Sequence, residues 1–128
     1  NTIEKGKPFT VRMKVQMHAP IEYPIFALSI KDAKGTEITG TNTMFEKTDF
    51  EVGPIMEISF EQDMNLQGGE YLLSFGCTGY NGTDFTVYHR LYDVCNITVV
   101  SDKNTVGYYD MNSKITVQTY EGTNICRK

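Results

Sequence analysis

Apolar and polar residues alternate along most of this chain, which is the pattern of strands with one buried face. The segment from residue 7 to 18 has Phe9, Val11, Met13, Val15 and Met17 in one phase and Thr10, Arg12, Lys14, Gln16 and His18 in the other. The same period of two recurs at residues 25–32, 56–60, 71–77, 85–100 and 114–120. Each of these segments is therefore predicted to be a strand, with 85–100 forming either one long strand or two joined ones.

Turn residues separate these segments. Asp32-Ala-Lys-Gly35 has an aspartate that can accept from the backbone ahead of it and a glycine that is free to take positive φ, so we expect a turn there, with a strand restarting at Thr36. Apolar residues nowhere recur at helical spacing over three turns. Seven or eight short strands without a helix predict an all-β fold, an antiparallel β-sandwich of immunoglobulin-like or jelly-roll type.

Length, net charge and cysteine content narrow the class of protein. A length of 128 residues fits one domain, for which we expect a linker remnant at 1–6, the sandwich at 7–120 and a terminal tail at 121–128. The chain begins without Met, so we expect it to be a piece of a longer protein. A net charge of −4 with scattered basic residues argues against nucleic acid as a partner. The widely spaced, odd set Cys77, Cys95 and Cys126 favours a reducing compartment.

Residues for chemistry are sparse. His18 and His89 are the only histidines, and neither lies in a nucleophile motif. The glycines form no phosphate-binding loop, and the cysteines lack the close pairs that a zinc site needs. The sequence therefore predicts a binding domain rather than an enzyme, with no metal and no cofactor.

One polar row on the predicted sheets has recognition chemistry. Tyr88, Arg90 and Tyr92 share the phase opposite to Phe85, Val87 and Leu91. Tyrosine rings can stack on sugar rings, and a guanidinium can hydrogen-bond sugar hydroxyls. Arg12 and Gln16 are donors in the outward phase of the first long strand, so we interpret these five residues as a candidate carbohydrate site. The alternative is an ordinary exposed strand face, which favours the same residues through β-propensity alone.

An ordered set of motifs resembles a known family. The residues are Asp32-x-x-Gly35-x-x-Ile38-x-Gly40-Thr41-Asn42-Thr43, then FEVG at 50–53, MNLQGGEYLLSFGC at 64–77 and YDVCNITVVSDKNTVGYYDM at 92–111. Their order and spacing resemble the C-terminal domain of Wzt-type proteins, the ATP-binding subunits of ABC transporters that export O-antigen and related cell-surface polysaccharides. The resemblance covers essentially the whole chain.

The resemblance implies a non-catalytic cytoplasmic domain, joined to an upstream ABC ATPase domain, that recognises the terminus of a lipid-linked polysaccharide for export. It implies association with a transmembrane subunit at the inner face of the cell membrane. It also implies a homodimer formed by exchange of the last strand, with residues 101–114 as the hinge ahead of 115–120. Gly40–Thr43 resembles a family signature that shapes a strand and its following loop, from which Asn42 and Thr43 could reach a ligand.

Two alternatives remain at the level of sequence. The first is a secreted carbohydrate-binding module of a polysaccharide-degrading enzyme, which would share the sandwich. The second is an immunoglobulin-like adhesive module whose partner is another protein. The unpaired cysteines count against both extracellular alternatives.

Overall fold

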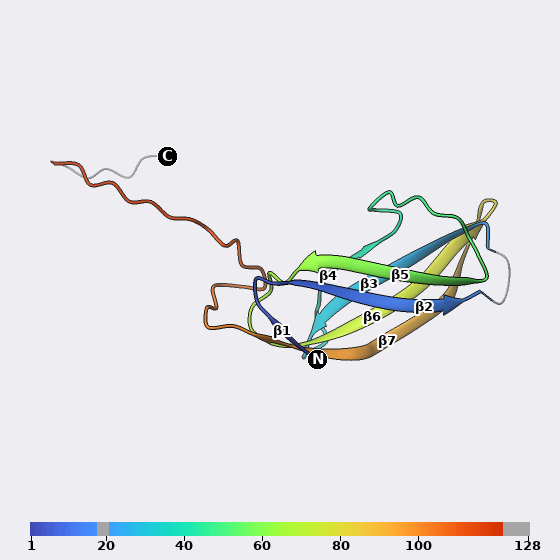
Figure 1. Cartoon of the computed structure of the whole chain (residues 1–128), viewed down its shortest axis with the longest axis horizontal. Coiled ribbons are helices and arrows are strands. Elements are labelled where there is room, and N and C mark those ends of the chain that lie inside the picture. The colour runs from blue at the N-terminus through green and yellow to red at the C-terminus, as the bar shows by residue number, and fades with distance from the viewer. Residues whose placement is uncertain (18–20, 122–128) are drawn as a thin grey trace.

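The computed structural model describes residues 1–17 and 21–121, and for residues 85–94 it describes the backbone alone. The described residues form seven strands in two facing sheets (Figure 1). The strands are β1 (Thr2–Glu4), β2 (Pro8–Gln16), β3 (Tyr23–Asp32), β4 (Glu37–Asn42), β5 (Ile55–Asp63), β6 (Gly69–Asn81) and β7 (Asp84–Val100). One sheet has the order β1-β7-β6-β3-β4, and β2 and β5 alone form the other.

The predicted sandwich and most of its predicted strands are confirmed. The alternation of residues 7–18 becomes β2, whose odd-numbered side chains are half-buried and whose even-numbered side chains are exposed. Residues 85–100 lie in one long strand, β7. It pairs with β6 through two breaks in register, between Leu73 and Phe75 and between Cys77 and Thr78.

The larger sheet is mixed rather than purely antiparallel, because β1 pairs with β7 in parallel. Residues 1–6, which we expected to be a linker remnant, contain this strand. Thr2 lies beside Thr98 and Glu4 beside Val100 in the ladder. Three residues are too few to show a hydrophobic period, so the sequence pattern gave no sign of β1.

The prediction of a strand at 114–120 was wrong, because residues 111–121 belong to no strand. This segment, here called the tail, runs away from the sandwich as a single extended arm (Figure 1). The side chains of Ile115 and Val117 are 83% and 82% exposed. The alternation is present, but the described chain supplies no neighbouring strand for it. The predicted terminal segment 121–128 lies, from residue 122 on, outside the described residues.

The core lies between the two sheets. Phe26, Leu28 and Ile30 of β3 and Leu73 of β6 face β2 and β5, as do residues of β7. The side chains that β2 and β5 contribute are mostly half-buried, including Phe9, Val11, Met13, Val15, Met56 and Ile58. A two-stranded sheet is narrower than the five-stranded sheet that it covers, so the sandwich is open along its sides.

The turn predicted at Asp32–Gly35 is confirmed. Asp32 Oδ1 accepts hydrogen bonds from Lys34 N at 3.0 Å and Thr36 N at 2.8 Å, and Gly35 has a φ of 89°. These N–H groups, with the Tyr108 hydroxyl, stabilise the charged carboxylate and lower the pKa of Asp32.

Candidate ligand-binding surfaces

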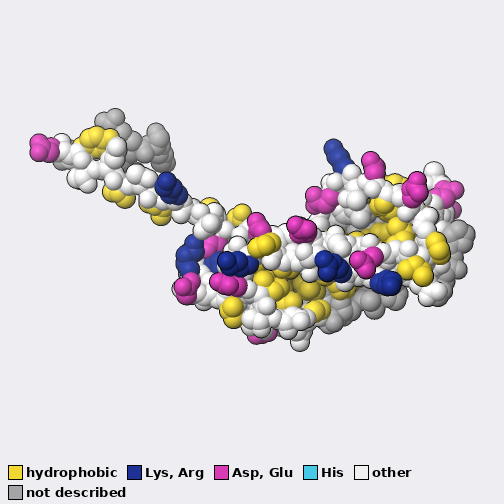
Figure 2. Space-filling view, viewed as in Figure 1, with side chains coloured by type: hydrophobic (Ala, Val, Ile, Leu, Met, Phe, Trp, Pro, Cys, Tyr) yellow, Lys and Arg dark blue, Asp and Glu magenta, His cyan; other side chains and the backbone are white. Residues whose placement is uncertain are grey.

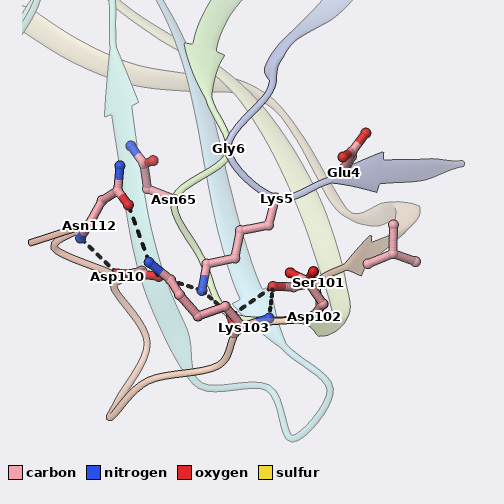
Figure 3. A pocket seen from close by; sticks show the side chains of 10 residues that line it. Glu4, Lys5, Gly6, Asn65, Ser101, Asp102, Lys103, Asp110 and Asn112 are labelled. Atoms are coloured by element: carbon pink, nitrogen blue, oxygen red, sulfur yellow. Dashed lines mark hydrogen bonds and ion pairs between the residues drawn. The ribbon is translucent and has the colours of Figure 1, made fainter.

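A polar network fills a depression at the end of the sandwich where the tail begins (Figure 3). At its centre, Lys5 Nζ lies 2.7 Å from Asp110 Oδ2, and both side chains are nearly buried. Lys5 Nζ also donates to Gln67 Oε1 at 2.9 Å and to the Lys103 carbonyl at 2.7 Å. All three ammonium protons therefore have acceptors within the protein.

Asp110 is equally well paired. Its Oδ2 lies 3.2 Å from Lys103 Nζ, and its Oδ1 accepts from Asn112 N at 2.7 Å. The hydrogen bond from Lys5 is the largest cause that lowers the pKa of Asp110 to about 2. Because the charges are compensated within the chain, we interpret this Lys5–Asp110 network as a structural clamp rather than a ligand site.

A shallow depression of about 460 Å³ lies along β3 and β4. Ala27 and Ser29 of β3 lie beside Asn42 and Gly40 of β4 in the ladder, so small residues line part of it. We call it the outer-face depression. Phe45 also lines it, and the side chain of Phe45 is 69% exposed. Glu37, Thr39 and Thr41 add oxygen atoms to the lining. An exposed ring beside small and hydroxyl-bearing residues can hold a flat polar molecule by stacking and hydrogen bonds.

The segment Gly40–Thr43 builds the turn that carries Phe45. Asn42 Oδ1 accepts from Phe45 N at 2.7 Å, and Thr43 Oγ1 accepts from Phe26 N at 3.2 Å. Thr41 Oγ1 donates to Glu46 Oε2. A methyl group on Gly40 would lie 2.9 Å from the Leu28 carbonyl oxygen, which favours glycine here. These contacts support the interpretation of this motif as mainly structural.

A third depression, of about 590 Å³, runs between β5 and the β4–β5 loop. We call it the β5-edge groove. Its apolar lining includes Met56, Ile58 and Phe60 of β5, together with Phe26 and Phe50, whose ring centroids are 5.9 Å apart. Such an apolar groove beside a strand edge has the character of an uncovered part of the core.

The structure divides the five predicted site residues between the two sheets. Arg12 and Gln16 lie on β2, in its exposed phase. Tyr88, Arg90 and Tyr92 lie on β7 of the larger sheet, and their side chains are outside the described residues. The backbone register places Arg90 beside Gly76, which in turn lies beside Ala27. The β7 residues are therefore two ladder steps from the outer-face depression, whereas Arg12 and Gln16 are on the other sheet.

Sequence reasoning missed Phe45. The segment Asn42-Thr-Met-Phe-Glu-Lys-Thr-Asp49 has no alternation, so no strand phase could assign this ring to a surface. The available signal was a large aromatic residue inside a polar turn directly after the Gly40–Thr43 motif. A turn that exposes an aromatic ring incurs the unfavourable hydration of that ring, which is a reason to test it for recognition.

These features define a domain class: an all-β sandwich with open depressions and no described helix long and apolar enough to cross a bilayer. The sequence matches the Wzt C-terminal domain family over residues 1–111, and the chain belongs to that family. It is therefore a domain of the kind carried by ATP-binding proteins of ABC exporters.

A solved structure supports this assignment. The chain is similar to the structure described as "Crystal structure of the C-terminal domain of wzt", with 25% sequence identity and a TM-score of 0.81. The match covers 91% of this chain and 74% of that one. A comparison with curated protein sequences gave no match.

Proposed function

We propose that this domain binds carbohydrate and selects a lipid-linked cell-surface polysaccharide of the O-antigen kind for export. The observation that carries the proposal is the exposed Phe45 ring on the outer-face depression, in a domain of an exporter family. Stacking of a sugar ring on Phe45 and hydrogen bonds to neighbouring hydroxyls would suit an uncharged sugar. Tyr88, Arg90 and Tyr92 on β7 extend the proposed site across the same sheet.

The family also supports the remaining parts of the proposal. The domain acts without catalysis in the cytoplasm, at the inner face of the membrane, joined to an ABC ATPase domain and associated with a transmembrane subunit. It works as a homodimer. Membership of an exporter family favours this function over a secreted module of a polysaccharide-degrading enzyme.

The test is titration of the purified domain with surface polysaccharide from the organism that encodes it. Calorimetry or protein NMR measures the binding. We expect binding, and we expect Phe45→Ala to weaken it by about 1–3 kcal/mol, the usual loss for a removed stack and its hydrogen bonds. Tyr109→Ala is the matched control, because Tyr109 is also an exposed aromatic residue but lies beside Leu66, away from the depression.

The possible outcomes are distinct. Absence of binding up to millimolar glycan would contradict carbohydrate recognition as a whole. If Phe45→Ala leaves glycan affinity unchanged, carbohydrate recognition is supported but the site does not lie at the outer-face depression. Tight binding to plant polysaccharides instead of the host glycan would favour the secreted module.

A further inference from the structure

The hairpin between β6 and β7 carries the one Asn-Gly pair of the sequence, Asn81-Gly82. Asparagine followed by glycine is the pair most prone to deamidation. Glycine has no side chain to hinder the approach of its backbone nitrogen to the carbonyl carbon of the asparagine side chain. The residues that surround this pair therefore decide whether the folded chain carries a reactive site.

The backbone of the hairpin explains why the pair is present. Asn81 lies beside Asp84 in the ladder of β6 with β7, so Gly82 and Thr83 form a two-residue turn. Gly82 has a φ of 62°, which such a turn needs and which glycine adopts without strain. The turn itself favours glycine at position 82, and the reactive pair is a consequence.

Glu22 contacts both members of the pair. It directly precedes β3, whose Tyr23 lies beside Tyr80 of β6, and this register brings Glu22 next to Asn81. Glu22 N donates to Asn81 Oδ1 at 2.9 Å, and Gly82 N donates to Glu22 Oε2 at 2.7 Å. One residue therefore bonds, through its backbone and its side chain, to the two groups that react with each other in deamidation.

Deamidation of this pair needs water alone as a co-reactant. Gly82 N loses its proton and attacks Asn81 Cγ, the bond from Cγ to Nδ2 breaks, and the departing nitrogen takes up the proton and leaves as ammonia. Water then opens the resulting succinimide ring at either of its carbonyl groups, which leaves aspartate or isoaspartate at position 81. Glu22, Asn81 and Gly82 are all exposed, so water reaches the site.

The Glu22 carboxylate opposes the first step of this reaction. A carboxylate is too weak a base to remove the proton of a backbone amide, so its charge-assisted hydrogen bond stabilises Gly82 N in the protonated form. Its negative charge also disfavours the anion that Gly82 N must become. The bond from Glu22 N polarises the Asn81 carbonyl and acts in the other direction. The carboxylate prevails, because attack cannot begin before the nitrogen is deprotonated.

We propose that Asn81-Gly82 is a latent deamidation site of this domain and that Glu22 keeps it unreactive. Deamidation places a negative charge beside the Glu22 carboxylate. Its isoaspartate product also adds a carbon to the backbone where position 81 pairs with Asp84, so it loosens the hairpin from the start of β3. The outer-face depression contains none of these residues, so this proposal stands or fails separately from carbohydrate recognition.

The test is peptide mapping by mass spectrometry after incubation of the purified chain at mildly basic pH. It measures how fast aspartate and isoaspartate accumulate at position 81. We expect Glu22→Ala to speed this reaction about tenfold or more, which corresponds to about 1.4 kcal/mol of activation free energy. The unsubstituted chain unfolded in urea gives the unprotected rate. We expect the folded unsubstituted chain to react more slowly than this reference and folded Glu22→Ala to approach it.

Two further variants identify the cause. Glu22→Gln keeps a neutral acceptor for Gly82 N and removes the charge, so its rate should lie between those of the unsubstituted chain and Glu22→Ala. Glu70→Ala is the matched control, because Glu70 is also an exposed acid but lies at the other end of β6, where it accepts from Thr98 Oγ1. This control should leave the rate at position 81 unchanged.

The chain also contains an internal reference. Asn112-Ser113 lies in the tail, which projects from the body into solvent (Figure 2), and its rate corrects for differences in buffer and temperature between samples. Circular dichroism confirms that each variant is folded during incubation.

Three results would overturn the proposal. The first is a folded unsubstituted chain that reacts at position 81 as fast as the unfolded one. The second is an equal rate in the unsubstituted chain and in Glu22→Ala, which would mean that the hairpin alone protects the pair. The third is a slower reaction in Glu22→Ala and Glu22→Gln, which would make the carboxylate a base that assists deamidation.

Discussion

Lys5 and Asp110 join the first turn of the sandwich to the base of the tail, with Lys5 Nζ 2.7 Å from Asp110 Oδ2. The two residues lie near opposite ends of the sequence, and the pair is nearly closed to solvent. Lys103 contacts the same carboxylate from the surface, with its side chain 54% exposed. One acid therefore has a buried and an exposed cation, which allows their contributions to be compared.

We expect Lys5→Met to lower the thermal midpoint clearly more than Lys103→Met. Lys5 also bonds to Gln67 and to the Lys103 carbonyl, so its loss removes three interactions from a nearly buried site, whereas an exposed ion pair contributes little. Thermal unfolding followed by circular dichroism compares the two variants. Equal midpoints would contradict the role of Lys5 as the centre of the clamp.

The clamp should also give the domain an acid-labile component. The folded-state pKa of Asp110 is about 2, below its ordinary value of 3.8. A carboxyl whose pKa is lowered by folding stabilises the protein above its unfolded-state pKa, and the stabilisation is lost as the pH falls. We expect the free energy of unfolding to decrease as pH falls from about 4 to about 2 and to do so less steeply in Asp110→Asn. Urea unfolding at several pH values measures both slopes, and parallel slopes would contradict the assignment.

Two phenylalanines should separate stability from recognition. Phe26 is 1% exposed within the core, so Phe26→Ala should cost about 3–5 kcal/mol of unfolding free energy. Phe45 is largely exposed, so Phe45→Ala should change stability by no more than about 0.5 kcal/mol. Urea unfolding of both variants checks this. A large loss in Phe45→Ala would mean that the ring supports the fold, which would weaken its assignment to the glycan site.

Gly79 should tolerate no side chain. A methyl group there would lie 2.6 Å from the Tyr23 carbonyl oxygen and 3.0 Å from Ile21 Cγ2, so we expect Gly79→Ala to destabilise the domain by about 1–3 kcal/mol. Gly53→Ala is the control, because the nearest atom to its methyl group would be 4.0 Å away. Similar unfolding midpoints for the two variants would show that β3 and β6 can separate at this point.

Residues of β7 give a further test of the glycan site. We expect Tyr88→Ala or Arg90→Ala to weaken glycan binding by about 1–3 kcal/mol without unfolding the domain. Arg12→Ala and Gln16→Ala serve as comparisons on the other sheet and should leave affinity unchanged. Calorimetric titration with the host glycan measures all four. If Arg12→Ala and Gln16→Ala weaken binding and the two β7 variants do not, the glycan site lies on the exposed face of β2.

The strands were predictable because burial on one face imposes a period of two. Phe9, Val11, Met13 and Val15 on β2, and Met56, Ile58 and Phe60 on β5, show that period directly. Strand β1 was not predictable, because a three-residue parallel strand depends on β7 as its neighbour rather than on its own pattern. Ile115 and Val117 show the converse, since an alternating segment forms no strand without a neighbour to pair with.

The candidate site was less predictable than the fold. Strand phase identified Arg12 and Gln16 as outward residues, but it could not show that they and the β7 residues belong to different sheets, because sheet membership depends on pairing between distant segments. The Lys5–Asp110 network was missed for the same reason. Lys5 belongs to no motif, the motif at 92–111 gives no sign of a partner for Asp110, and their contact exists only once β1 and the loop after β7 have docked.

The clamp has a mechanical consequence. Lys5 follows directly on β1, and Asp110 lies directly before the tail, so the ion pair couples two segments that would otherwise move independently. A displacement of the tail at residue 111 therefore acts on the Lys5–Asp110 pair and on the hydrogen bond from Asp110 N to the Asn65 carbonyl. The ion pair thereby links the amino-terminal strand to the start of the tail at a place that shares no residue with the outer-face depression.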